Sequence, residues 1–146
     1  MQQLDPHTLF SIFEKGDEEV YKEHNIPDVL DNPYVLMGMV VRGIENFTLM
    51  DMMYMRSYPE QYKNVRALIK DKYFNKLYGY LNRIDSTKFD SIYKIGASFE
   101  ISTVTTALNL LLSYFENKEE YEKCGTIKHY IENLTLESAK RIYNFS

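Results

Sequence analysis

The feature that most constrains the fold of this chain is a pair of apolar stripes in residues 104–134, joined by a short polar turn. The first segment carries five apolar side chains at helical spacing: Val104, Leu108, Leu111, Leu112 and Phe115. The second segment has a similar pattern in Tyr121, Cys124, Ile127, Ile131 and Leu134. Side chains three, four and seven positions apart share one face of a helix. Two such helices can hide both stripes by folding against each other. The sequence therefore predicts an antiparallel helical hairpin over residues 103–134, with its turn at residues 116–119.

The second half of this hairpin carries an ordered set of residues. Residues 119–128 read Glu-Glu-Tyr-Glu-Lys-Cys-Gly-Thr-Ile-Lys. This order resembles the second helix of the UVR motif, a helical hairpin of bacterial excision-repair subunits and of adaptors of ATP-dependent proteases. Phe115 and Glu116 depart from that family, which favours small alanines there, and His129 replaces its aspartate. The resemblance covers residues 108–134, and it implies that the hairpin pairs with a similar hairpin on a protein partner.

Capping residues and prolines divide the first half of the chain into helices. Asp5-Pro6 predicts a helix that ends at Gly16, and residues 17–23 predict one or two acidic surface turns. Asn32-Pro33 and Pro59 begin two long helices, because asparagine caps a helix and proline fits its first turn. We expect the first helix to run through Phe47 and the second to about residue 84, with residues 33–57 in the interior of the domain.

The second half is expected to contain three further boundaries. A short helix should stop at Gly96, and Ser102 or Thr103 should cap the first arm of the hairpin. The β-branched residues between 101 and 106 would also permit a strand, but their pattern continues smoothly into the hairpin. Thr135 is expected to cap a separate terminal helix.

Four glycines lie within the predicted helices. Gly38 and Gly43 would allow neighbouring helices to approach closely, and Gly79 would bend or divide its helix. Because glycine is a poor helix former, Gly125 indicates either close approach of another backbone or a local break. With these elements, 146 residues form one all-α domain of six or seven helices.

Composition limits the environment of the protein. A single cysteine allows no internal disulfide, and there is no apolar run of about 18 residues. We therefore expect a cytoplasmic protein without a membrane span. Thirteen tyrosines, no tryptophan and many Asn, Lys and Ile residues are typical of a genome rich in A and T. Such small proteins are often encoded by bacteriophages or by AT-rich bacteria, and a bacteriophage origin would place this one in the host cytoplasm or the virion.

No catalytic motif is present, and no cofactor or metal is expected. The acidic cluster Asp17, Glu18, Glu19 and Glu23 beside His24 fits a solvated helix face better than a metal site. Cys124 and His129 are five residues apart and lie on different sides of a helix, the first as a buried hydrophobe and the second on the surface. We expect a protein that is not an enzyme.

Two segments are candidates for contact with a protein partner. The first candidate is the hairpin, with the contact residues Phe115, Glu119, Glu120, Tyr121 and Lys128. The second candidate is the methionine-rich segment, with Met52, Met53 and Met55. Flexible methionines can adapt to varied partners, but they can equally fill an irregular core. The leading hypothesis is a non-catalytic adaptor, assembly or regulatory protein that acts through helix–helix contacts.

An alternative function uses the basic central region. Residues 59–95 hold eight basic and four acidic side chains, whereas the whole chain has a net charge of -4. Lys63, Arg66, Lys70 and Lys76, interleaved with tyrosines, could bind nucleic acid through phosphate contacts and stacking. A net acidic chain repels polyanions, so docking on an acidic surface, its own or a partner's, is the preferred interpretation. A repeated structural subunit of a virion is a further alternative.

Overall fold

The computed structural model describes residues 32–84 and 89–143, which form five helices and no strand. They are α3 (Pro33–Ser57), α4 (Pro59–Arg83), α5 (Phe89–Ser98), α6 (Ile101–Asn117) and α7 (Tyr121–Tyr143). The all-α prediction is confirmed for this part of the chain. The helix expected after Asp5-Pro6 and the acidic segment of residues 17–23 lie outside the described residues. The total of six or seven helices therefore stays a prediction.

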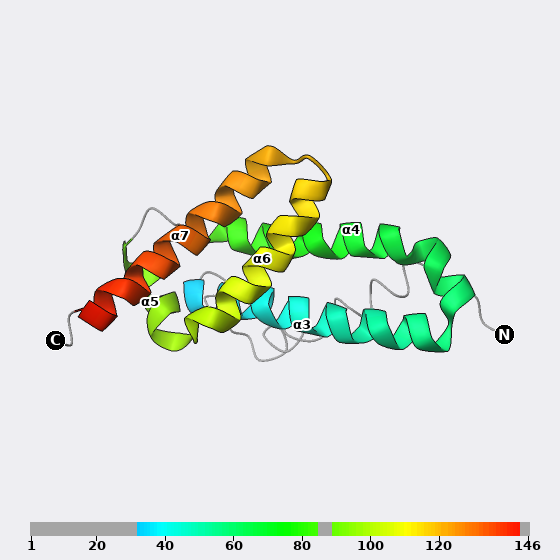
Figure 1. Ribbon diagram of the computed structural model, residues 1–146, viewed down its shortest axis with the longest axis horizontal. Coiled ribbons are helices and arrows are strands. Elements are labelled where there is room, and N and C mark those ends of the chain that lie inside the picture. Colours follow the sequence, from blue (N-terminus) through cyan, green and yellow to red (C-terminus); the bar gives the residue numbers. More distant parts are fainter. Residues whose placement is uncertain (1–31, 85–88, 144–146) are drawn as a thin grey trace.

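Four of the five helices form two hairpins that cross each other (Figure 1). Helices α3 and α4 run antiparallel and are connected at Tyr58, while α6 and α7 form the second hairpin, which packs across the first. The short helix α5 leads from the first hairpin to the second and contacts α3 and α7. The turn of the α6–α7 hairpin projects beyond α4 (Figure 1).

The starts of α3 and α4 are fixed by local chemistry. The Asn32 side chain accepts a hydrogen bond from the Tyr34 backbone N–H at 2.8 Å, and Pro33 occupies the first turn. Pro59 occupies the first turn of α4, which also contains Glu60. Because these signals are carried by single residues, the predicted starts of both helices agree with the structure, and the end of α4 agrees to within one residue. Helix α3 continues past Phe47, where its apolar pattern was expected to end, to Ser57.

Helix α3 supplies the centre of the core, as predicted, because it packs against α4, α5 and α6. Its buried face includes Leu36, Val40, Ile44 and Phe47. The Phe47 ring meets the rings of Tyr73 and Phe74 on α4, and an added Cβ on Gly43 would overlap the side chain of Leu77. The close approach predicted for Gly43 is therefore confirmed, whereas one face of α3 stays open to solvent.

The predicted hairpin is also present, with one change in its second stripe. All five apolar residues of the first stripe are buried on α6, as are Cys124, Ile127 and Leu134 on α7. Tyr121 is 71% exposed, and Tyr130, which the pattern omitted, is 1% exposed. Tyr121 is the first residue of α7, ahead of the buried stripe, so its assignment to the core was wrong.

Three predicted helix boundaries were also wrong. Thr135 lies inside α7 and donates its hydroxyl to the Ile131 carbonyl at 2.7 Å, which satisfies that hydroxyl without a cap. Helix α6 begins at Ile101, ahead of Ser102 and Thr103. Gly125 interrupts nothing, because packing of the α7 stripe holds the helix across it.

Gly79 also lies inside an uninterrupted helix, α4, and a Cβ on either this residue or Gly125 would meet nothing within 4 Å. Among the helices of residues 32–84 and 89–143, none has the length and hydropathy of a membrane-spanning segment.

Candidate interaction surfaces

The turn between α6 and α7 is a tight helix ending built on Glu119. The backbone N–H groups of Glu119 and Glu120 donate to the carbonyls of Glu116 and Phe115, each at 3.0 Å. This hydrogen-bond pattern needs a residue in the left-handed conformation, usually glycine. Here Glu119 adopts it, with φ of 58°. The turn therefore holds an exposed carboxylate where a smaller residue would fit with less strain.

The structure places most of the predicted hairpin contacts on the surface around this turn. Glu119, Tyr121 and Lys128 are exposed, and Glu120 is half-buried, with its carboxylate 3.1 Å from the Lys123 ammonium. Phe115 is fully buried, so its assignment as a contact residue was wrong. Its ring packs against the Tyr78 ring, and the Lys123 ammonium nitrogen lies 4.9 Å from the centroid of the Phe115 ring. The tip of the hairpin is thus an acidic surface around one exposed tyrosine.

Contacts with α4 hold the hairpin in place. The Tyr114 hydroxyl donates to the Asp71 carboxylate at 2.6 Å, and Lys123 donates to the Asn75 side chain at 2.6 Å. Burial and the hydrogen bond to Asp71 raise the pKa of Tyr114. Lower down, the Tyr130 hydroxyl donates to the Ile84 carbonyl at 2.6 Å, just beyond the end of α4. The tip is therefore supported by a rigid base.

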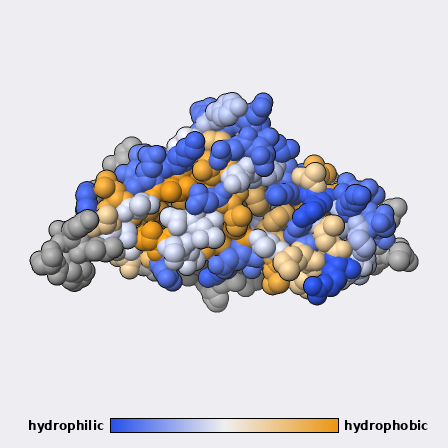
Figure 2. All heavy atoms as spheres, in the orientation of Figure 1, coloured by the Kyte–Doolittle hydropathy of each residue, from blue (hydrophilic) through white to orange (hydrophobic). Residues whose placement is uncertain are grey.

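The methionine-rich segment of α3 divides into two faces. Met52 and Met53 are 57% and 58% exposed, whereas Met50 and Met55 are partly buried against the core. Met50 and Met55 therefore help to fill the core, whereas contact of Met52 and Met53 with a partner stays a prediction. In the space-filling view, apolar surface is visible over the C-terminal half of α3 (Figure 2).

Between these methionines, Asp51 is buried and joins α3 to α4. Its carboxylate accepts the Tyr62 hydroxyl at 2.7 Å and receives both Nε and a terminal nitrogen of Arg66, at 2.9 and 2.7 Å. Burial and the hydrogen bond to Asp51 raise the pKa of Tyr62, and the same carboxylate raises the pKa of Arg66. Sequence reasoning missed this cluster, although an aspartate at helical spacing from the buried Phe47 was a usable signal.

The cluster also bears on the nucleic-acid alternative. Arg66 is engaged by Asp51, Lys70 lies over the rings of Phe74 and Tyr114, and Lys76 lies 5.9 Å from the Tyr80 ring centroid. Lys63 is exposed. Three of the four residues thus have partners within the chain, and for Arg66 the expected acidic surface is the protein's own.

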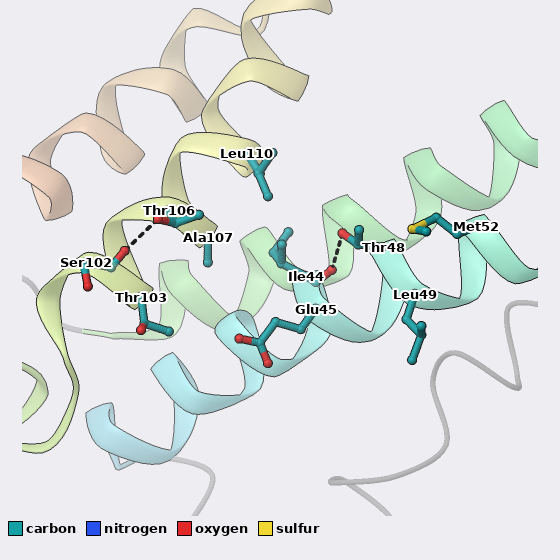
Figure 3. Close-up of a pocket in the computed structure, with 10 residues that line it drawn as sticks. All are labelled: Ile44, Glu45, Thr48, Leu49, Met52, Ser102, Thr103, Thr106, Ala107 and Leu110. Carbon is teal, nitrogen blue, oxygen red and sulfur yellow. Dashed lines mark hydrogen bonds between the residues drawn. The ribbon is translucent and has the colours of Figure 1, made fainter.

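An apolar groove lies between α3 and α6 (Figure 3) and has a volume of about 560 Å³. Leu49 and Met52 line it on α3, and Leu110 and Ala107 line it on α6. Leu49 and Leu110 are 58% and 49% exposed. Sequence periodicity could not locate this groove, because it depends on how α6 crosses α3.

Few other groups among the described residues could act in catalysis or metal binding. Cys124 is buried as expected, and burial raises the pKa of its thiol, while His129 is exposed. No three His, Cys, Asp or Glu side chains of residues 32–84 and 89–143 gather as a metal site requires. No protein-family model, curated protein or solved structure matches the chain.

Proposed function

We propose that this protein is a non-catalytic adaptor or assembly factor whose α6–α7 hairpin docks on a protein partner through its tip. The observation that carries the proposal is the exposure of Tyr121. This side chain is 71% exposed at the end of a hairpin in which the other large apolar residues of 101–140, apart from Leu110 and Leu136, are buried or partly buried. Exposed aromatic residues on a rigid support are frequent anchors of protein interfaces.

The charge around Tyr121 specifies the kind of partner. Glu116, Glu119 and Glu122 are exposed close to it in the sequence, and Glu120 is half-buried. Such a surface favours a basic partner and repels an acidic one. The resemblance of residues 108–134 to the UVR motif also supports the proposal, because in that family the hairpin pairs with another hairpin.

The left-handed conformation of Glu119 is a further support. An L-residue in this conformation costs about 1–2 kcal/mol, and strained residues are often found at functional sites. A carboxylate in this strained position is consistent with a role in binding at the tip.

The test is quantitative affinity capture from the cells in which the protein is made, with mass spectrometry and with nuclease treatment. Tyr121→Ala and Glu120→Lys should each lower recovery of the partner at least about tenfold, as expected for a central interface residue. Both variants should keep the unfolding temperature near that of the unmodified protein, because these side chains are exposed or half-buried.

Leu136→Ala is the matched control, because Leu136 is an exposed apolar residue on the same helix but far from the tip. It should retain the partner. Equal recovery with all three variants would show that the hairpin tip is not the docking surface. Loss of every captured protein on nuclease treatment would instead favour the basic residues of α4.

A further inference from the structure

Helix α3 presents to solvent a stripe whose spacing is the same in both chain directions. Glu45, Leu49, Met52 and Arg56 are all exposed and are separated by four, three and four residues. Residues at these intervals lie on one face of a helix. The two apolar side chains occupy the middle of the stripe, and opposite charges occupy its two ends.

This order makes the stripe complementary to a second copy of itself. When two α3 helices pack antiparallel about a two-fold axis between residues 50 and 51, Leu49 of one copy faces Met52 of the other. The same axis brings Glu45 of each copy opposite Arg56 of the other. These two charge pairs lie at the ends of the contact, about 16 Å apart along the helix. A two-fold interface requires this kind of self-complementarity, whereas parallel packing would place like charges together.

The residues around the stripe are compatible with packing of an α3 helix from a second copy. Glu45, Leu49 and Met52 form one side of the groove between α3 and α6, and Leu110 adds apolar surface on the other side (Figure 3). The Thr48 and Thr106 hydroxyls donate to carbonyls of their own helices, at 2.9 and 2.7 Å. An apolar partner can therefore cover them without leaving a donor unpaired.

The charge in the groove selects between partners. Among the described residues that line it, Glu45 is the one charged side chain. A wholly apolar partner would cover this carboxylate without compensation, which is costly, whereas a second copy supplies Arg56. We infer that the groove between α3 and α6 is the interface of a homodimer, in which the α3 helices of two copies pack antiparallel.

Charge reversal tests the arrangement by sedimentation velocity of the purified full chain, whose monomer has a mass of 17.3 kDa. Glu45→Arg and Arg56→Glu should each raise the dimer dissociation constant at least about tenfold, because each replaces two opposite-charge contacts with two like-charge contacts. The double variant should dimerise like the unmodified protein. Lys63→Glu, an exposed change of equal charge on α4, is the matched control and should have no effect.

Mixing the two single variants gives the sharpest readout. One chain then carries two arginines and the other two glutamates at the ends of the stripe, so a one-to-one heterodimer should form at concentrations at which each variant alone dimerises weakly. A chain that is monomeric at all concentrations, or a mixture that fails to associate, overturns the inference. Dimerisation unaffected by both single changes would also overturn it.

Failure here is distinguishable from failure of the proposed hairpin function. The sedimentation experiment contains no partner protein, and Tyr121→Ala and Glu120→Lys should leave dimerisation unchanged because neither residue lines the groove. Circular dichroism of each α3 variant establishes that it is folded.

Discussion

At the scale of single residues, Glu119 lowers the stability of the hairpin but places a carboxylate on the proposed binding surface. Its left-handed conformation is imposed by the two hydrogen bonds that close the turn on Glu116 and Phe115. Glycine adopts this conformation without steric cost, although it gains more freedom in the unfolded chain. The residue thus reduces the stability of the hairpin while keeping a carboxylate beside Tyr121.

We expect Glu119→Gly to raise the free energy of unfolding by about 0.5–1 kcal/mol, because relief of the left-handed strain outweighs the added chain entropy. Urea denaturation measures the change. Glu122→Gly, at a helical position in the first turn of α7, should instead lower it by up to about 1 kcal/mol. A loss of stability in both variants would show that Glu119 makes a stabilising contact that outweighs its strain.

The same replacement should have the opposite effect on docking. If Glu119 contributes to the acidic tip, the more stable variant should recover less of the partner in the capture experiment. Such a trade-off between stability and function is common where a strained residue belongs to a binding surface.

At the scale of helices, two glycines of similar appearance in the sequence have opposite roles. Gly43 lies where α3 meets α4, and a Cβ there would overlap the Leu77 side chain, which is itself 3% exposed within the core. Gly125 lies on the exposed side of α7, with nothing within 4 Å of a Cβ. Periodicity alone cannot distinguish these two environments.

Alanine substitution should therefore change the unfolding temperature in opposite directions. We expect Gly43→Ala to destabilise the protein by about 1–2 kcal/mol net, because Leu77 has little room to move in a packed core. Gly125→Ala should stabilise α7 by up to about 1 kcal/mol through helix propensity. Thermal denaturation monitored at 222 nm checks both. An unchanged or higher unfolding temperature for Gly43→Ala would mean that α3 and α4 can separate at little cost.

The helices show which parts of the fold are legible in the sequence. Asn32, Pro33 and Pro59 act on their own backbone or on residues next to them, so their helix starts could be predicted. Tyr121 and Tyr130 could not be assigned correctly, because the turn at Glu119 determines which face α7 presents to α6. The spacing of Asp51 from Phe47 indicates that its side chain faces the core, but its partners lie 11 and 15 residues away on another helix, and no local pattern identifies them.

The candidate surfaces divide in the same way. Glu119, Glu120, Tyr121 and Lys128 follow a polar turn, so their surface positions could be expected, whereas Phe115 belongs to the buried stripe that precedes it. The groove between α3 and α6 arises from helix crossing. Its floor of Thr and Ala side chains carries no distinctive signal in the sequence.

At the scale of the whole molecule, two buried tyrosines link stability to pH. Tyr62 connects α4 to Asp51 on α3, and Tyr114 connects α6 to Asp71 on α4. Burial, followed by these hydrogen bonds, raises the pKa of both hydroxyls above the ordinary tyrosine value. As the pH rises past about 10, the unfolded chain therefore loses these protons before the folded protein does.

We expect the stabilisation from these tyrosines to be fully present below about pH 10 and to decline above it. Tyr62→Phe and Tyr114→Phe should each cost about 1–2 kcal/mol at neutral pH through the lost hydrogen bond. Each should also make the alkaline decline shallower. Urea denaturation between pH 7 and 11 measures both effects, with Tyr121→Phe, a change at an exposed ring, as the control. A decline as steep as in the unmodified protein would show that other groups cause it.

The connection of the two hairpins has a consequence for how the chain reaches this structure. In each hairpin the partner helices are consecutive in the sequence and are separated by one residue at Tyr58 or by three residues at 118–120. Loop closure over so few residues has a small entropy cost, so either hairpin can form before the two meet. Chains dominated by such sequence-local contacts belong to the fast-folding class.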